Sequence, residues 1–164
     1  PGHGLFFKEA IEIIGNNCKY TAVDISSISL NLTKSIISFF QLGDNSIAYL
    51  NEDILNYKSK ELYDFIVMGE VLEHVERPDI LLSRLNSILS ESGSVFISTC
   101  VDCPTIDHVY HFKSIDEIRG MIKQTGFDIV SDKILPVENL PIGEIIDRKI
   151  AINYSAIIRK INIL

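Results

Sequence analysis

The sequence predicts an α/β fold built on a doubly wound, mostly parallel sheet that is covered by helices on both faces. Short apolar runs of strand length alternate with segments whose apolar residues recur at helical spacing. Strands and helices that alternate in this way build mostly parallel sheets. The 164 residues contain no internal repeat, low-complexity tract or linker-like stretch, which indicates one domain over residues 1–164.

Each predicted element is identified by the period of its apolar residues and by the residues that begin and end it. The first part of the chain predicts a helix over 4–14, a strand over 20–23 that ends at Asp24, a helix capped by Ser26 or Ser27 and ended by Gly43, and a strand over 47–50. The second part predicts a fully buried strand over 63–68, a helix opened by Pro78 and followed by Gly93, a buried strand over 94–99, a helix with Ser114 and Glu117 as a capping box that ends at Gly126, and strands over 127–135 and 151–159.

The composition is that of a soluble globular protein. The net charge of −7 argues against broad nucleic-acid binding, because an acidic surface repels a phosphate backbone. No apolar run approaches the roughly 18–20 residues that a membrane span needs, so no membrane partner is expected. There is no recognisable secretion signal, and we expect a cytoplasmic protein. The composition leaves the oligomeric state open.

The three cysteines are Cys18, Cys100 and Cys103, and the last two have the C-x-x-C spacing of redox and zinc motifs. A redox pair of the thioredoxin kind sits at a helix N-terminus, whereas this pair follows a strand and runs into Pro104. A zinc site would need a second such pair, and the sequence has none. We interpret the pair as reduced thiols in a loop.

The chain opens with glycines directly before a helix, and an acidic residue follows at a diagnostic distance. Gly2 and Gly4 allow the backbone to come close to a ligand, and the start of a helix favours an anionic group. Asp24 ends the next strand, twenty residues after Gly4, where a carboxylate accepts hydrogen bonds from the ribose of an adenosine cofactor. The alternative is that Asp24 is the N-cap of the following helix.

A second acidic residue follows the next strand. Asp53, followed by Ile54, is placed to hydrogen-bond an adenine amino group while the isoleucine packs on the ring. The alternative is a solvated turn residue.

These segments together resemble the successive motifs of class I S-adenosylmethionine (SAM)-dependent methyltransferases. The resemblance covers nearly the whole chain and is nearest to the small-molecule branch that includes the ubiquinone-biosynthesis O-methyltransferases. Its most specific piece is GEVLEHV over residues 69–75, and HFKSIDEIRGMIKQTGFDIV over 111–130 is similar to the family's penultimate helix and strand. The other matching pieces are Gly2-His3-Gly4, Asp24, Asp53-Ile54 and the strand over 63–68.

The resemblance implies a Rossmann-like sheet, SAM as the cofactor, and methyl transfer to a small-molecule hydroxyl or amine. Gly2 and Gly4 would approach the methionine part of SAM, and Gly69 and Glu70 would lie beside its methyl-bearing end. The implied cofactor-binding residues are Gly2, His3, Gly4, Asp24, Ile25, Asp53, Ile54, Gly69 and Glu70. Glu70 and His74 are the candidate catalytic residues, with His74 as a general base where the acceptor must lose a proton.

The same region predicts a divalent metal site. Glu70, Glu73 and His74 share one face of any helical turn, and His108 and His111 follow the next strand. The pattern resembles metal-dependent O-methyltransferases, among them RNA 3′-end methyltransferases, and predicts Mg²⁺, Mn²⁺ or Zn²⁺ on Glu70, Glu73, His74 and His111. The alternative is that Glu73 and His74 shape the substrate rim without a metal.

The family's glycine loop normally follows an apolar strand in the middle of the sheet, and the sequence starts at Pro1, after the place of that strand. We therefore expect the first strand to be missing from this sequence, which would begin inside the cofactor loop. Losing a central strand would expose the apolar flanks of its two neighbours.

Three other functions fit parts of the pattern. A metal-dependent RNA 2′-O-methyltransferase fits the Glu and His set, although the acidic charge opposes it. A nicotinamide (NAD)-binding oxidoreductase fits the glycines with a later Asp. A non-catalytic SAM-binding module would use the cofactor-binding residues to bind SAM without transferring its methyl group.

Overall fold

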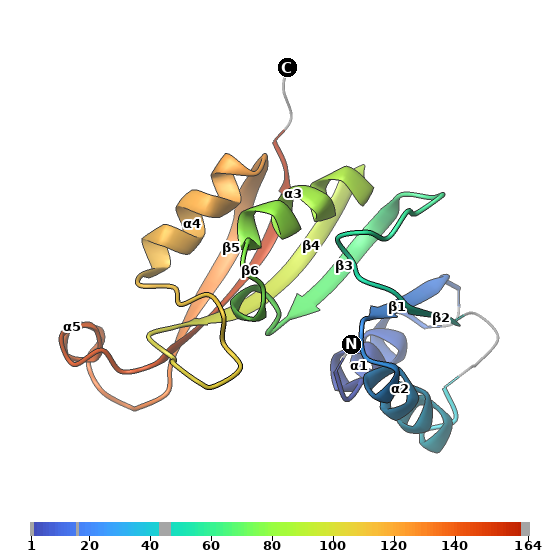
Figure 1. Cartoon of the computed structure of the whole chain (residues 1–164), viewed down its shortest axis with the longest axis horizontal. Helices are drawn as coiled ribbons and strands as arrows, with labels where there is room; N and C mark the ends of the chain where they lie inside the picture. Colours follow the sequence, from blue (N-terminus) through green and yellow to red (C-terminus); the bar gives the residue numbers. More distant parts are fainter. Residues whose placement is uncertain (1, 16, 43–46, 162–164) are drawn as a thin grey trace. The chain divides into compact units, whose positions relative to one another are not determined.

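The computed structural model describes residues 2–15, 17–42 and 47–161, so the predicted helix end at Gly43 lies outside the described residues. The chain divides into two compact units, Pro1–Lys58 (unit 1) and Ser59–Leu164 (unit 2), each with its own sheet (Figure 1). Each unit combines strands with helices, which confirms the predicted α/β class. Along the described ranges, no helix is long and apolar enough to cross a membrane.

Unit 1 is a two-stranded parallel sheet with two helices. Its elements are α1 (Leu5–Ile14), β1 (Tyr20–Asp24), α2 (Ser27–Phe39) and β2 (Ile47–Asn51), as the apolar periods predicted. The apolar residues Ile11, Tyr20 and Ile37 are buried together and form its core. Ser26 is the N-cap of α2, since its Oγ accepts a hydrogen bond from the Ser29 amide at 3.3 Å.

Unit 2 is a four-stranded sheet in the order β3-β4-β6-β5, in which β3 and β4 are parallel and the other neighbours antiparallel (Figure 1). Its elements are β3 (Tyr63–Gly69), the 3₁₀-helix η2 (Leu72–His74), α3 (Pro78–Ile88), β4 (Leu89–Val101), α4 (Ile115–Gln124), β5 (Phe127–Pro136), α5 (Ile142–Asp147) and β6 (Ile152–Lys160). Its core holds the fully buried side chains of Leu81, Leu85, Ile97, Ile122, Phe127 and Ile158.

The predicted capping box at α4 is present in a shifted form. The Ser114 Oγ accepts from the Glu117 amide at 3.1 Å, as expected for an N-cap. The Glu117 carboxylate reaches one residue further back than predicted and accepts from the Lys113 amide at 2.8 Å. Both hydrogen bonds fix the start of α4.

The prediction of a fully buried strand over 63–68 is wrong. Within β3 only Met68 is buried, while Phe65 and Val67 are 45% and 39% exposed. β3 is an edge strand of its sheet in the described structure and pairs only with β4. An edge strand has a neighbour on one side only, so its side chains make fewer contacts than those of a central strand.

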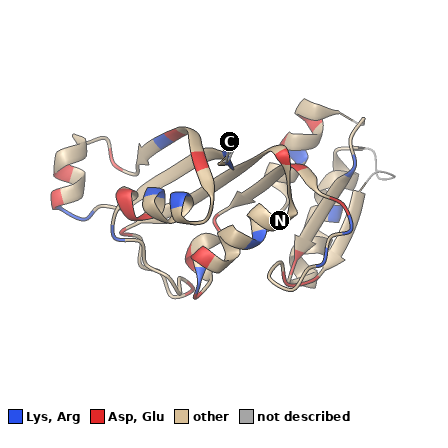
Figure 2. Cartoon of the chain, turned by 90° about the horizontal axis from the view of Figure 1, so that it is seen from above, with Lys and Arg blue, Asp and Glu red and all other residues tan. Residues whose placement is uncertain are grey.

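Charged residues of both signs lie interspersed along helices and loops (Figure 2). Several are paired on helix surfaces at i, i+4, such as Lys8 with Glu12 at 2.7 Å and Arg148 with Glu144 at 3.0 Å. Mixed charges of this kind are typical of a solvated surface.

Candidate functional site

In unit 1 the structure brings Asp24 together with the turn Gly2-His3-Gly4 that precedes α1, the glycine turn. The Gly2 amide donates to Asp24 Oδ2 at 3.3 Å, and the Ser26 amide donates to Asp24 Oδ1 at 2.8 Å. Asp24 lies at the carboxyl end of β1, the end at which sheets of this kind bind ligands. Since the cap of α2 is Ser26, the alternative reading of Asp24 as that cap is wrong.

Gly4 is buried against α2, and its backbone has a left-handed conformation with φ +81°. A Cβ at this position would lie 2.8 Å from Thr33 Cα and 2.9 Å from Thr33 Oγ1. Thr33 is itself fully buried, and its hydroxyl donates to the Ser29 carbonyl oxygen at 3.0 Å. Only glycine fits both the conformation and the space, so the turn before α1 depends on this residue.

The other predicted cofactor residues of unit 1 are held less firmly. Asp53 accepts from the Leu55 amide at 2.9 Å and from the Asn56 side chain at 3.0 Å, an arrangement typical of a turn-forming aspartate. Ile25 is 76% exposed, His3 is exposed, and Ile54 is half-buried. Their roles toward adenine and the rest of the cofactor stay predictions.

In unit 2, Glu70 follows the end of β3 in an unusual backbone conformation. Its φ of +52° is in the left-handed region, which a non-glycine residue occupies at a cost of about 1–3 kcal/mol. Two hydrogen bonds to Ser98 hold it there: the Glu70 amide donates to the Ser98 carbonyl oxygen at 2.9 Å, and Ser98 Oγ donates to Glu70 Oε1 at 2.6 Å. In this backbone conformation the exposed Glu70 carboxylate lies directly after the end of β3, next to Gly69.

Glu73 is a buried carboxylate with one unsatisfied oxygen. Its side chain is 1% exposed, and Thr99 Oγ1 donates to its Oε2 at 2.7 Å. Its Oε1 has no hydrogen-bond partner within the part of the chain that the structure describes. Burial raises the pKa of Glu73, the Thr99 hydrogen bond opposes this, and the nearby Glu70 charge adds to it.

Two histidines face this carboxylate with their Nε2 atoms available. His74 Nδ1 lies 2.9 Å from the Asp107 carbonyl oxygen, and His108 Nδ1 lies 2.6 Å from the Cys103 carbonyl oxygen. A carbonyl only accepts, so each Nδ1 carries a proton, and in the neutral imidazole each Nε2 then keeps its lone pair. The rings meet edge-on at 5.0 Å between centroids. Histidines that bind metals are held in this way by a carbonyl at the second nitrogen.

The structure brings together only part of the predicted metal set. Glu73, His74 and His108 each offer a ligand atom within 4.8 Å of the other two, whereas His111 belongs to no such group among the described residues. The loop folds back onto η2 because the Val109 and Tyr110 amides donate to the Glu73 carbonyl oxygen at 2.8 and 2.9 Å. This brings His108 inward, while His111 is exposed beside the buried Phe112. Glu70 groups instead with Glu73 and Cys100.

The C-x-x-C pair also lies here, and its cysteines are free. Burial raises the pKa of the Cys100 thiol, and its interactions with Cys103, Glu73 and Glu70 raise it further. Cys100 is therefore a poor nucleophile in this environment. The third cysteine, Cys18, is exposed in unit 1.

We expect Glu73→Gln to change how stability depends on pH. A carboxyl whose folded-state pKa is raised above 4.5 stabilises the fold at low pH, and this contribution is lost as the pH rises through the raised value. In the presence of a chelator, the variant should therefore have a higher free energy of unfolding than wild type at neutral pH, by roughly 1–3 kcal/mol. The difference should shrink towards pH 4.5, and a difference independent of pH would contradict the burial argument.

Comparison with known proteins agrees with this fold. A family model described as a methyltransferase domain matches residues 1–132. The chain belongs to this family, the class I SAM-dependent methyltransferases, as the sequence motifs predicted.

The mitochondrial ubiquinone biosynthesis O-methyltransferase of Dictyostelium discoideum is 32% identical over 89 residues. That segment is 49% of this chain and 28% of the relative, so the similarity spans less than a third of the relative's length.

Solved structures share the fold at low identity. The N-methyltransferase NodS from Bradyrhizobium japonicum WM9, in complex with S-adenosylhomocysteine, has a TM-score of 0.73 at 17% identity, over 96% of this chain and 73% of that one. An O-methyltransferase from a polyketide synthase of Brevibacillus brevis, also in complex with S-adenosylhomocysteine, has a TM-score of 0.74 at 18% identity, over 99% and 65%. The cyclase SpnF has a TM-score of 0.76 at 9% identity, over 97% and 72%.

Proposed function

We propose that this chain binds SAM and transfers its methyl group to a small-molecule hydroxyl or amine. The observation that carries the proposal is the contact of Asp24 with the glycine turn, at the end of β1, in a chain of the methyltransferase family. The Asp24 carboxylate, at the carboxyl end of β1, is suited to accept hydrogen bonds from both ribose hydroxyls of the cofactor.

The sulfonium of bound SAM supplies an electrophilic methyl group, so the protein's task is to align the acceptor and exclude water. His74 is suited to accept a proton from an acceptor hydroxyl, because its Nδ1–H donates to the Asp107 carbonyl oxygen and its Nε2 keeps a lone pair. An acceptor that carries a neutral amine needs no such base in the methyl-transfer step.

The relatives support both acceptor classes. The Dictyostelium discoideum relative and the Brevibacillus brevis enzyme are O-methyltransferases, and NodS is an N-methyltransferase. The similarity to SpnF is a reminder that one fold carries different reactions, so the test must detect the transferred methyl group as well as cofactor binding.

A divalent ion on Glu73, His74 and His108 fits the residues present. The unsatisfied Glu73 Oε1 and two imidazoles with their Nδ1–H groups held by carbonyls are the donors that such an ion needs. One carboxylate with two imidazoles favours Zn²⁺ or Mn²⁺ over Mg²⁺. Such an ion would lower the pKa of an acceptor hydroxyl.

The proposal is tested by calorimetric titration of the protein with SAM, S-adenosylhomocysteine and NAD, followed by mass spectrometry of hydroxyl and amine acceptors incubated with methyl-labelled SAM. We expect SAM and S-adenosylhomocysteine to bind and label to appear on an acceptor. Binding of NAD in place of SAM would indicate the oxidoreductase. SAM binding with no acceptor labelled would indicate the non-catalytic module, and labelling of RNA alone would indicate the RNA enzyme.

Mn²⁺ affinity is expected to fall by on the order of 10–100-fold in His108→Ala and to stay unchanged in His111→Ala. The reason is that the structure places His108, and not His111, with Glu73 and His74. Calorimetry with Mn²⁺ alone measures this independently of activity. Equal loss in the two variants would contradict the grouping, and wild-type protein that binds no Mn²⁺ would leave His74 as a base without a metal.

A further inference from the structure

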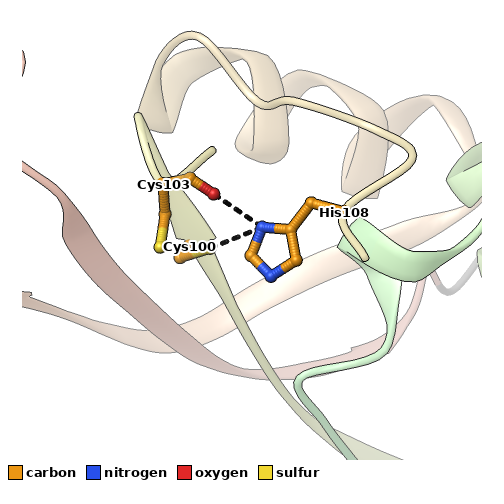
Figure 3. A group of neighbouring side chains, drawn as sticks. All are labelled: Cys100, Cys103 and His108. Atoms are coloured by element: carbon orange, nitrogen blue, oxygen red, sulfur yellow. Dashed lines mark hydrogen bonds between the residues drawn. The ribbon is translucent and has the colours of Figure 1, made fainter. Parts of the chain in front are cut away.

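Two thiols and one imidazole converge beyond the carboxyl end of the central strand β4 (Figure 3). Cys100 belongs to the end of that strand, and Asp102 then turns the chain with a left-handed φ of +51° towards Cys103. His108 returns from the following loop, where its Nδ1 lies 3.9 Å from Cys100 Sγ. One ligand atom from each of the three residues lies within 4.8 Å of the other two.

These separations are close to those of a metal site. Zinc bonds of about 2.3 Å to sulfur and 2.0–2.1 Å to nitrogen, at tetrahedral angles, place a sulfur and a nitrogen ligand roughly 3.5 Å apart and two sulfurs roughly 3.8 Å apart. The sulfur of Cys100 and Nδ1 of His108 are therefore within about half an ångström of that spacing. Side-chain movements of about 1 Å would bring in the third ligand.

We propose that Cys100, Cys103 and His108 form a binding site for a thiophilic divalent cation such as Zn²⁺. Three protein ligands leave one position of the tetrahedron for water or another ligand. The sequence contains no second cysteine pair. The missing ligand is instead the histidine of the spacing C-x2-C-x4-H, which the loop folds back to the thiols.

The surroundings favour a cation over the other uses of such a pair. Glu70 and Glu73 both offer carboxylate oxygens within 4.8 Å of the Cys100 sulfur. Negative charges at this distance disfavour a bare thiolate, which a nucleophilic or redox-active cysteine requires, and they attract a metal ion. Sulfur and imidazole donors then select a borderline or soft ion over Mg²⁺.

The two metal sites of this loop exclude each other through His108. Its Nδ1 lies near the Cys100 sulfur and donates to the Cys103 carbonyl oxygen, so the neutral ring would use Nε2 for an ion shared with Glu73 and His74. A neutral imidazole has a single lone pair and serves one ion at a time. A thiophilic ion on Cys100 and Cys103 would use Nδ1, which would then release the Cys103 carbonyl oxygen, and His108 would leave the Glu73 and His74 group.

The first experiment needs no variant. The full chain, reduced and freed of metal, is treated with a maleimide in the presence and absence of Zn²⁺, and modification of each cysteine is followed by mass spectrometry. Zn²⁺ should slow modification of Cys103 by on the order of tenfold or more, while the exposed Cys18 serves as an internal control and should react at the same rate. Equal rates at Cys103 with and without Zn²⁺ would overturn the proposal.

The second experiment identifies the ligands. Co²⁺ in place of Zn²⁺ should give a thiolate-to-cobalt charge-transfer band in the near ultraviolet, which Cys103→Ser should abolish and Cys18→Ser should leave unchanged. His108→Ala should weaken Co²⁺ binding by on the order of 10–100-fold, and His111→Ala should not. Cys103 is chosen because it is only half-buried, so the serine variant is expected to fold, which a thermal melt checks.

The remaining outcomes separate this site from that of the proposed function. Co²⁺ that binds without the charge-transfer band would sit on Glu73, His74 and His108 alone and would overturn the thiolate site. If the site exists, Cys103→Ser should keep Mn²⁺ binding while losing the cobalt band, whereas His108→Ala should weaken both.

Discussion

Replacing Gly4 with alanine should lower the free energy of unfolding by about 2–5 kcal/mol, the largest effect we expect from a single methyl group in this chain. About 1–2 kcal/mol comes from the left-handed backbone, whose φ of +81° an L-residue resists. The rest comes from overpacking, because the added Cβ would lie 2.8 Å from the Thr33 backbone in a fully buried contact. Because the nearest atom belongs to the backbone of α2, relieving this contact requires the turn or α2 to shift.

Gly2 provides a control in the same turn. Its φ is also positive, +58°, but a Cβ there would meet nothing within 4 Å. Gly2→Ala should therefore cost only the backbone strain, about 1–2 kcal/mol. Urea unfolding of both variants measures the difference, and hydrogen exchange at α1 and β1 assigns it to unit 1. Equal destabilisation would show that the contact between Gly4 and Thr33 contributes nothing.

Local signals in the sequence predicted most of the elements and many of their ends, although β4 begins at Leu89 rather than at the predicted Ser94, and Gly93 lies within that strand. The caps Ser26 and Ser114 were predictable because a side-chain oxygen satisfies a nearby amide within its own helix. The proline at the start of α3 acts in the same local way. Even so, α5 (Ile142–Asp147) was not predicted, since six residues give too little apolar period to recognise.

Features that depend on distant contacts were harder to predict. An apolar run such as 63–68 indicates a strand, but its burial depends on which neighbours cover it, and Phe65 and Val67 are in fact exposed. The candidate metal ligands show the same limit. Glu73 and His74 were predicted together from their adjacent positions, whereas the choice between His108 and His111 as their neighbour depends on hydrogen bonds from the loop to the Glu73 carbonyl oxygen. The spacing of residues in the sequence gives no indication of these hydrogen bonds between the loop and Glu73.

Asp24→Ala should weaken the binding of SAM and of S-adenosylhomocysteine by on the order of 1–3 kcal/mol, which corresponds to roughly 5–150-fold in Kd. The proposed loss is a charge-assisted pair of hydrogen bonds to the ribose. The carboxylate also accepts from the Gly2 and Ser26 amides, so its removal loosens the turn that precedes α1.

Two comparisons separate the ribose contact from this structural role. Asp24→Asn keeps an oxygen that can accept from the Ser26 amide, so a large loss of affinity with little change in Tm would point to the ribose. Ser26→Ala removes the cap of α2 and costs about 1 kcal/mol of stability while leaving the carboxylate in place, so it should bind SAM nearly as well as wild type. Calorimetric affinities for Asp24→Ala equal to those of wild type would remove the ribose assignment, because the end of β1 would then hold a carboxylate that the cofactor does not use.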